Sequence, residues 1–269
     1  MDLRVDVPPV VVVNPPAPEG SSSAGAGGDD SADDVVFRSD VTVELVRSAA
    51  QDSDVLFAAR VSTQGERSLE QVDADASRSA GLINYLMRDR HGTPFEHSSM
   101  TFYVQAPIFV FREFMRHRIA SYNEESGRYR QLRPMFYVPG PDRRLTQVGK
   151  PGHYEFREGT AEQHALVEAE TKQSCRRAYA SYRRMLDAGV AREVARIVLP
   201  LTIYSSMYVT MNARALMNFL SLRTSRPDSR FPSFPQREIE LCAERMEEEW
   251  ARLMPLTHAA FEANGRVAP

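Results

Sequence analysis

The sequence predicts an α+β fold in which a mixed or antiparallel sheet is flanked by helices. Short segments of apolar and alternating residues, typical of strands, stand beside longer segments with helical periodicity. The two kinds of segment mix without the regular strand–helix–strand alternation of a doubly wound sheet. We therefore expect helices to pack on a sheet whose neighbouring strands run mainly in opposite directions.

The elements of the first half each have a local justification. Alternation of apolar and polar residues indicates strands, an N-cap indicates the start of a short helix, and a proline suits a first helical turn. In chain order they are a strand at 41–46, a short helix from Ser53 and Asp54 through Ala59, a helix at 77–88, a strand at 100–104, and a helix from Pro107 into Arg116.

The second half is more helical. Gly189 and Pro200 are helix-terminating residues, and Asn212 is a favourable N-cap. A proline-rich loop separates the last two helices. The predicted elements are helices at 160–188 and 192–198, a strand at 204–211, and helices at 213–222 and 236–254.

Composition and charge limit the possible classes of protein. The chain has 269 residues, of which 42% are hydrophobic and 26% charged, as is ordinary for a soluble globular protein. The net charge is -3, but residues 1–40 hold seven acidic and two basic residues, which leaves the remainder about two charges positive. A body so near neutrality argues against a general nucleic-acid binder. No apolar run approaches the ~20 residues of a membrane span.

The first 36 residues differ in composition from the rest. They are rich in Pro, Gly, Ser and Asp, and such a segment buries too little apolar surface to offset its ordering entropy. We expect a disordered tail at 1–36 and a single domain at 37–269. Cys175 and Cys242 are the only cysteines, without metal-ligand spacing around them, so a disulfide framework is excluded and a cytoplasmic location is predicted.

A cation-rich segment between Arg112 and Arg133 is the most informative part of the chain. It follows the apolar run 106–111, so its guanidinium groups are brought to the end of a buried element rather than along a solvated face. Guanidinium forks suit phosphate and carboxylate oxygens, and Ser126-Gly127-Arg128 adds a hydroxyl and a closely approachable backbone. The segment therefore predicts an anion site for a phosphorylated ligand.

Three further segments carry clustered polar side chains: His91 to His97, Arg192 to Pro200, and Asn212 to Arg223. With them, the chain resembles the flavin-dependent thymidylate synthase family. The family hallmark, Arg-His-Arg followed by seven residues and Ser, is met by Arg116-His117-Arg118 and Ser126. The other three segments resemble family motifs in the family's order. The resemblance covers about residue 37 to the end.

The resemblance implies an activity, the reductive methylation of dUMP to dTMP in de novo thymidylate biosynthesis. 5,10-Methylenetetrahydrofolate would donate the carbon, FAD would carry the hydride, and NADPH would reduce the flavin. The family's flavin site is built where subunits of a homotetramer meet. The chain lacks a Gly-x-Gly-x-x-Gly fingerprint, which is consistent with such a non-Rossmann site. The implied partners are small molecules and further copies of the chain, with no nucleic acid and no membrane.

The resemblance also implies site residues. Arg223 would be catalytic, because a guanidinium beside the pyrimidine can stabilise an anion developing at N3. His91 would lie near the folate. The dUMP-binding positions would be Glu113, Arg116, Glu124, Ser126, Gly127, Arg128, Arg196 and Arg223. The FAD-binding positions would be Ser62, Thr93, Arg116, His117, Arg118, Glu124, Asn212, Arg214 and Asn218.

This chain departs from the family in two places. Family members often carry Gln where Glu113 stands, so the role of an acid there is open. Some members place a histidine soon after the Leu-Arg pair, whereas residues 224–234 form a proline-rich segment without one. No flavin contact is therefore assigned to that loop.

Each feature has a simpler interpretation. Ser126-Gly127-Arg128 alone could be a surface turn, Asn212 only an N-cap, and Asn218 a core amide. The spacing of the histidines does not suit a zinc helix, so no metal site is expected. We expect both cysteines to be buried, and Glu247, Glu248 and Glu249 to form a solvated helix face.

Two other functions stay open on the residues alone. One is a non-catalytic nucleotide- or RNA-binding module that uses the cationic segment. The other is a related flavoenzyme that acts on another uracil-containing substrate.

Overall fold

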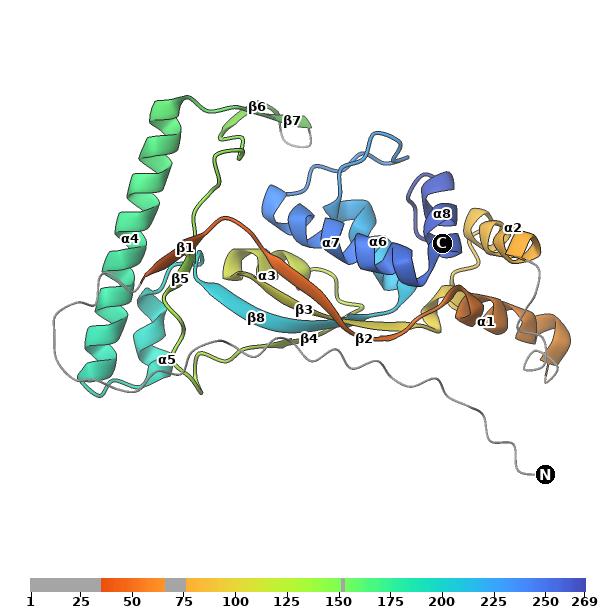
Figure 1. Cartoon of the computed structure of the whole chain (residues 1–269), viewed down its shortest axis with the longest axis horizontal. Helices are drawn as coiled ribbons and strands as arrows, with labels where there is room; N and C mark the ends of the chain where they lie inside the picture. The colour runs from red at the N-terminus through yellow and green to blue at the C-terminus, as the bar shows by residue number, and fades with distance from the viewer. Residues whose placement is uncertain (1–34, 66–75, 151–152) are drawn as a thin grey trace.

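The computed structural model describes residues 35–65, 76–150 and 153–269. Its centre is a four-stranded antiparallel sheet in the order β2-β3-β8-β4 (Figure 1). The strands are β2 (Thr42–Ala49), β3 (Ser99–Pro107), β8 (Tyr204–Met211) and β4 (Ser121–Glu124). Helices cover this sheet, so the α+β class with an antiparallel sheet is confirmed.

The two faces of the sheet differ in chemistry. Along β3 the side chains of Met100, Phe102 and Val104 are fully buried, while the alternate residues are only partly covered. On that second face Tyr103 packs against Tyr208 of β8, with ring centroids 6.0 Å apart. One face is therefore the core, and the other carries polar and aromatic side chains that solvent reaches.

Helices cover the apolar face of the sheet. They are α1 (Asp52–Gln64), α2 (Ala76–Arg88), α3 (Ile108–Phe114), α6 (Ala213–Arg223), α7 (Arg237–Leu253) and α8 (Pro255–Ala263), with the short 3₁₀ helix η2 (Thr93–Glu96) between α2 and β3. Trp250, Phe114 and Phe219 are fully buried in this core, and the last two rings stack with centroids 4.9 Å apart. These contacts fix the ends of α3 and α6 against each other.

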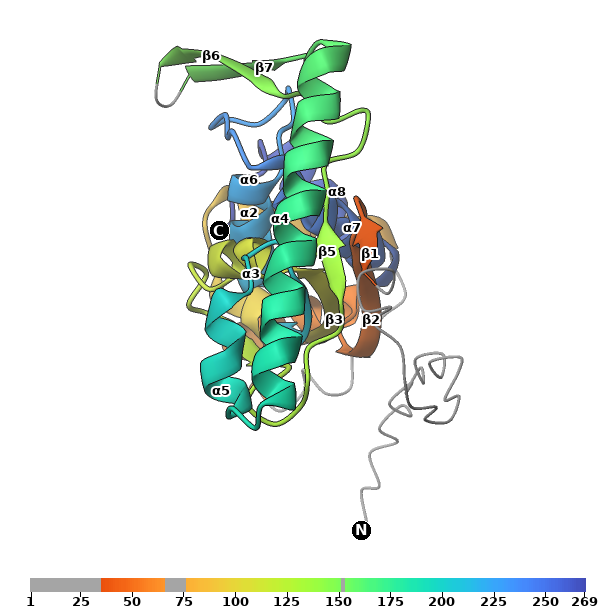
Figure 2. The same ribbon diagram turned by 90° about the vertical axis from the view of Figure 1, so that its left-hand side faces the viewer.

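A second, smaller layer lies at one end of the sheet. The long helix α4 (Ala161–Asp187) begins at a capping box on Thr160 and packs near α5 (Arg192–Ala195) and the 3₁₀ helix η3 (Arg196–Val198). The parallel pair β1 (Val36–Arg38) and β5 (Met135–Tyr137) lies beside it (Figure 2). Phe136, Tyr179 and Tyr182 are the main rings of its core. The hairpin β6 (Thr146–Lys150) and β7 (His153–Arg157) projects sideways beside the upper end of α4 in the same view.

The predicted long elements are confirmed, but several boundaries and burials are not. Residues 1–34 of the predicted tail lie outside the described residues, whereas Val35 is buried and Val36 begins β1. The predicted helix at 192–198 is split into α5 and η3. Both cysteines are buried as expected. None of the helices in the described ranges has the length and apolar character of a membrane span.

Glu247 corrects one prediction. It is buried, not part of a solvated face, because Arg266 and His258 pack against its carboxylate. Glu248 is exposed and Glu249 is partly exposed, so the prediction is right for Glu248 and partly right for Glu249.

Candidate active site

The Arg-His-Arg turn joins the end of α3 to β4. The hydroxyl of Tyr122, on β4, lies 2.7 Å from the carbonyl oxygen of Phe114 and 2.8 Å from that of His117. Burial raises the pKa of Tyr122 to about 12, so this hydroxyl remains protonated and able to donate. The turn is thus tied to the sheet, while the side chains of Arg116 and Arg118 are exposed. Neither guanidinium forms an ion pair with an acid in the part of the chain that the structure describes.

Arg223, the last residue of α6, reaches back to this turn. Its Nε donates to Nε2 of His117 at 3.0 Å, and its Nη1 donates to Oε2 of Glu113 at 2.5 Å. Only 18% of the Arg223 side chain is exposed. Burial raises the pKa of the Glu113 carboxyl, although the nearby Arg223 charge acts in the opposite direction. A rigid, partly desolvated guanidinium is therefore held at the C-terminal end of α6.

His117 accepts the Arg223 bond because it is neutral. Burial, and then the positive charge of Arg223, lower its pKa from 6.5 to about 4. Its ring also meets Phe219 edge-on, with centroids 4.9 Å apart.

This shift predicts how stability depends on pH. Between pH 6.5 and about 4 the unfolded chain protonates His117, but the folded chain does not. The free energy of unfolding should therefore fall as the pH falls through this window. Urea unfolding at several pH values should show a smaller pH dependence in His117→Asn, which keeps an acceptor but does not titrate. An identical pH dependence in the variant would contradict the assignment.

The Ser126-Gly127-Arg128 loop lies at the other end of β4, against η3. A Cβ added to Gly127 would stand 3.1 Å from Cδ1 of Leu132 and 3.3 Å from Cδ of Arg196, so the loop backbone is tightly packed. Arg128 forms an ion pair with Glu193 at 2.8 Å, and both side chains are more than half exposed. The positive charge of Arg196 acts on Glu124, whose pKa is nevertheless raised by burial. Arg128, Arg196 and Glu124 therefore lie at or beside this one loop.

A cavity of about 440 Å³ opens beside this loop on the polar face of the sheet. Glu124 and Ser126, both predicted, line it. Tyr129 and Arg130 were missed, although they are neighbours of Ser126 in sequence. Tyr103 and Tyr208 were also missed, and only strand pairing brings them here.

The His91 to His97 segment meets the N-terminal end of α6. Arg214 donates from Nη1 to Oε1 of Glu96 at 2.5 Å and from Nε to the backbone oxygen of Pro269 at 2.6 Å. Gly92 lies directly against this guanidinium, because an added Cβ would stand 2.4 Å from Cζ of Arg214. The conformation of the segment therefore fixes the position of Arg214.

The amide positions of α6 behave differently from each other. Oδ1 of Asn212 accepts from the backbone N–H of Ala215 at 2.8 Å, so Asn212 is an N-cap. Asn218 is exposed, which contradicts the alternative that it is a core amide. His91 is exposed and stacks on Tyr85, with centroids 5.6 Å apart.

Comparison with known proteins identifies the family. Residues 44–256 match the family model described as thymidylate synthase complementing protein. A flavin-dependent thymidylate synthase of Streptomyces coelicolor is 69% identical over 241 residues, which cover 88% of this chain and 98% of that protein. The chain belongs to the flavin-dependent thymidylate synthase family.

Solved structures agree with this assignment. The UMP/dUMP methylase PolB from Streptomyces cacaoi, bound with 5-Br dUMP, superposes with a TM-score of 0.84 at 55% identity. The match covers 87% of this chain and all of PolB. The structure of PolB bound with 5-Br UMP gives a TM-score of 0.81 at 54% identity. As the family name states, its members depend on a flavin.

The positions implied by the family fall into separate groups within one chain. Arg223 bonds to Glu113 and His117, but none of its hydrogen bonds or ion pairs among the described residues reaches Ser126, Arg128 or Arg196. The flavin positions divide in the same way. Asn212 and Arg214 lie at the start of α6, and Thr93 lies on η2, which contacts α6. Arg116, His117 and Arg118 lie near the end of α6, and Ser62 is exposed on α1. The 11 residues of α6 hold the two ends about 16 Å apart.

Proposed function

We propose that this chain converts dUMP to dTMP by reductive methylation, for de novo thymidylate biosynthesis. FAD would carry the hydride, NADPH would be the reductant, and 5,10-methylenetetrahydrofolate would donate the carbon. The observation that carries the proposal is the rigid guanidinium of Arg223, held by Glu113 and neutral His117 at a position that the family motif predicts. We also propose a cytoplasmic location, where the two buried thiols would remain reduced.

Arg223 supplies a positive charge where the reaction develops a negative one. Uracil C5 is a weak nucleophile until N3 loses its proton or C6 accepts a hydride. A guanidinium already oriented by two partners can stabilise the N3 anion without reorganising during the reaction. Glu113 is a positioning residue for that guanidinium, which gives the acid at this position a role.

The loop at the other end of β4 is suited to the substrate phosphate. The Ser126 hydroxyl and the forks of Arg128 and Arg196 are donors for phosphate oxygens, and Gly127 lets the backbone approach closely. Glu124 lines the adjoining cavity and can accept from a nucleoside group. These residues would bind and orient dUMP.

The residues present also fit a flavin dinucleotide. Arg116 and Arg118 are exposed and have no acidic partner in the described part of the chain, as expected for residues that bind an anionic pyrophosphate. Thr93, Asn212, Arg214, Asn218, Ser62 and the ring of His117 supply the further polar contacts, and His91 would lie near the folate. When bound, the reduced flavin supplies the hydride equivalent of the reaction.

We further propose that the active form is a homotetramer with sites built between subunits. The separation of the nucleotide and flavin positions within one chain supports this, because they must converge to serve one reaction. Large apolar side chains next to these groups are also exposed, among them Ile119 at 77%, Ile197 at 75% and Leu222 at 58%. Exposed apolar side chains of this size beside a site are typical of a subunit interface.

Loss of a phosphate contact should raise the KM for dUMP. Arg128→Ala removes one charge-assisted bond, which should cost about 1.5–3 kcal/mol and raise the KM roughly 10- to 150-fold. Glu193→Gln is the matched control. In the wild-type protein Glu193 would compete with the substrate phosphate for Arg128. Removing the charge of Glu193 should therefore leave the KM for dUMP unchanged or lower it. Steady-state kinetics at saturating cofactors measures both, and an unchanged KM in Arg128→Ala would contradict the assignment.

Two measurements test the proposed function as a whole. The purified protein should be yellow, absorb near ~450 nm and release FAD on denaturation. It should also release tritium from C5-labelled dUMP in a reaction that depends on NADPH and methylenetetrahydrofolate. A colourless protein that cannot be reconstituted with FAD would instead favour the nucleotide- or RNA-binding alternative.

A second candidate substrate is UMP. The 55% identical PolB is described as a UMP/dUMP methylase, which makes a ribonucleotide substrate a specific alternative. Tritium release from C5-labelled UMP, compared with dUMP at equal concentration, distinguishes the two.

A further inference from the structure

Residues 264–269, the C-terminal segment, turn back from α8 into the core. Gly265 and Arg266 both have left-handed backbones, with φ of 73° and 57°. The backbone N–H of Arg266 donates to the carbonyl oxygen of Phe261 at 2.9 Å, and Gly265 accepts from the N–H of Arg230 at 3.0 Å. An arginine seldom adopts this backbone, and here only 3% of its side chain is exposed. The segment therefore holds the Arg266 guanidinium in the interior.

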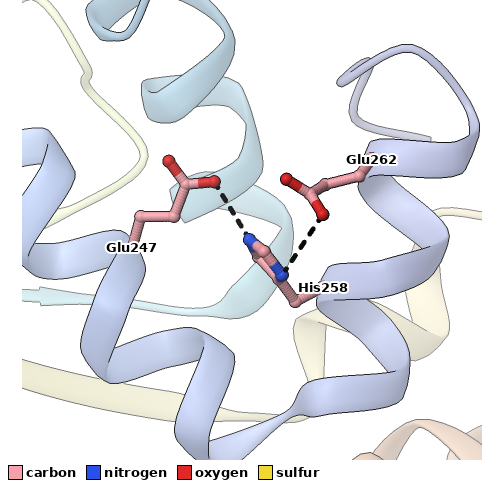
Figure 3. A group of neighbouring side chains, drawn as sticks. All are labelled: Glu247, His258 and Glu262. Atoms are coloured by element: carbon pink, nitrogen blue, oxygen red, sulfur yellow. Dashed lines mark hydrogen bonds and ion pairs between the residues drawn. The ribbon is translucent and has the colours of Figure 1, made fainter. Parts of the chain in front are cut away.

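Arg266 binds a buried carboxylate with two parallel hydrogen bonds. Its Nη1 and Nη2 donate to the two oxygens of Glu247, on α7, at 2.7 and 2.9 Å. His258, on α8, lies 3.0 Å from the same carboxylate, and Glu262 lies 3.9 Å from the other nitrogen of His258 (Figure 3). Burial alone would raise the pKa of Glu247, but bonds from His258 and Arg266 lower it to about 2. Both carboxylate oxygens are bound by the guanidinium, so the group is an ion-pair cluster, although its three side chains could be mistaken for metal ligands.

The same guanidinium contacts the residue that follows Arg223. Nη2 of Arg266 donates to the hydroxyl of Thr224 at 3.0 Å, and this hydroxyl donates to the carbonyl oxygen of Leu220 at 2.7 Å. The carbonyl oxygen of Thr224 accepts from the hydroxyl of Ser233 at 2.6 Å. Thr224 is the C-cap of α6 and is 1% exposed. Its backbone is thus fixed at the point where α6 ends and Arg223 turns toward His117.

We propose that Arg266, oriented by Glu247, is a positioning residue for Arg223 and acts through Thr224. The guanidinium of Arg266 is oriented by Glu247, fixes the Thr224 hydroxyl, and so fixes the last turn of α6. Residue Pro269 of the same segment contacts Arg214 at the other end of α6, so the segment braces the helix along its length. The catalytic part of this proposal rests on the proposed function, but the positioning of Arg223 does not.

The test compares side chains of nearly equal size. Thr224→Val removes the hydroxyl and keeps the shape, whereas Thr224→Ser keeps the hydroxyl. Because small misplacements of a reacting group are costly, Thr224→Val should lower kcat about tenfold or more, with the KM for dUMP within about threefold of wild type. Thr224→Ser should restore kcat to within about twofold. Arg266→Met should resemble Thr224→Val if it folds.

A control variant isolates the contact from the charge of the cluster. Glu262→Gln removes an acid 3.6 Å from Arg266 that does not contact Thr224, and it should leave kcat unchanged. Circular dichroism and flavin content, measured on the holoenzyme, correct each rate for the folded fraction. Wild-type kcat in Thr224→Val, or an equal loss in Glu262→Gln, would overturn the proposal.

A measurement independent of turnover separates this proposal from the proposed function. If Thr224→Val displaces Arg223, His117 loses one of the two causes of its low pKa, and NMR titration should show that pKa rising from about 4. An unchanged His117 pKa in Thr224→Val would overturn the positioning role, whatever reaction the enzyme catalyses. A raised His117 pKa in Thr224→Val, together with a wild-type protein that makes no dTMP, would uphold the positioning role and reject the proposed function.

Discussion

Arg223→Ala is expected to lower kcat by about 10²–10³-fold or more while FAD remains bound. The guanidinium of Arg223 is the only one in contact with both Glu113 and His117 among the described residues, so no neighbour can replace it. Its loss removes a charge that is oriented before the reaction begins. Tritium release from C5-labelled dUMP and the flavin absorbance of the same sample measure the two effects separately.

Two further substitutions define the role of Arg223. Arg223→Lys keeps the charge but loses the planar fork that serves Glu113 and His117 together, so we expect an intermediate rate. Arg252→Ala removes an exposed arginine from α7 and should leave the rate unchanged. Full activity in Arg223→Ala would refute the assignment of the N3 anion to this residue.

Much of the fold could be predicted because its long elements carry their own periodicity. The strands at 42–49, 99–107 and 204–211, and the helices α2, α4, α6 and α7, agree with the predicted ranges to within about three residues at each end. The short strands β1, β4 and β5 were not predicted, because three or four residues have no measurable period and form only when a partner strand is present. α8 was also missed, although Pro255 at its first turn gives a usable sequence feature.

The site shows a similar division between local and distant information. The motif order predicts roles for Arg223, Glu113 and His117. It could not predict that they contact one another, because 106 and 110 residues separate the partners. Glu247 was misjudged for the same reason. Its position in a charged run suggests that its side chain is exposed to solvent. The buried cation that binds it, Arg266, lies 19 residues later in the chain and reaches it only in the folded structure.

Gly92→Ala is expected to raise the Kd for FAD by about 10- to 150-fold, the effect of losing one charge-assisted hydrogen bond. Gly92 has an ordinary backbone, with φ of -76° and ψ of -33°, so alanine is not strained there. The new Cβ would instead stand 2.4 Å from Cζ of Arg214 and 2.6 Å from its Nε. A long side chain can move away at little cost, so the guanidinium leaves Glu96 and Pro269 while the fold is retained.

Stability should therefore change little although binding changes much. The Arg214–Glu96 pair is more than a third exposed on both sides, and such pairs contribute about 0–1 kcal/mol to the free energy of unfolding. Urea unfolding of the apoprotein measures the change in the free energy of unfolding, and titration with FAD measures the affinity for FAD. Gly81→Ala is the matched control, because it lies in α2 with open space around its added Cβ and should leave FAD affinity unchanged.

A double variant shows whether the effect passes through Arg214. In an Arg214→Ala background the clash at residue 92 has no partner, so Gly92→Ala should cause no further loss of FAD affinity. A further loss of similar size would mean that Gly92 itself approaches the flavin. Wild-type affinity in the Gly92→Ala single variant would instead remove Arg214 from the flavin site, and leave its bonds to Glu96 and Pro269 as a purely structural link between η2, α6 and the C-terminal segment.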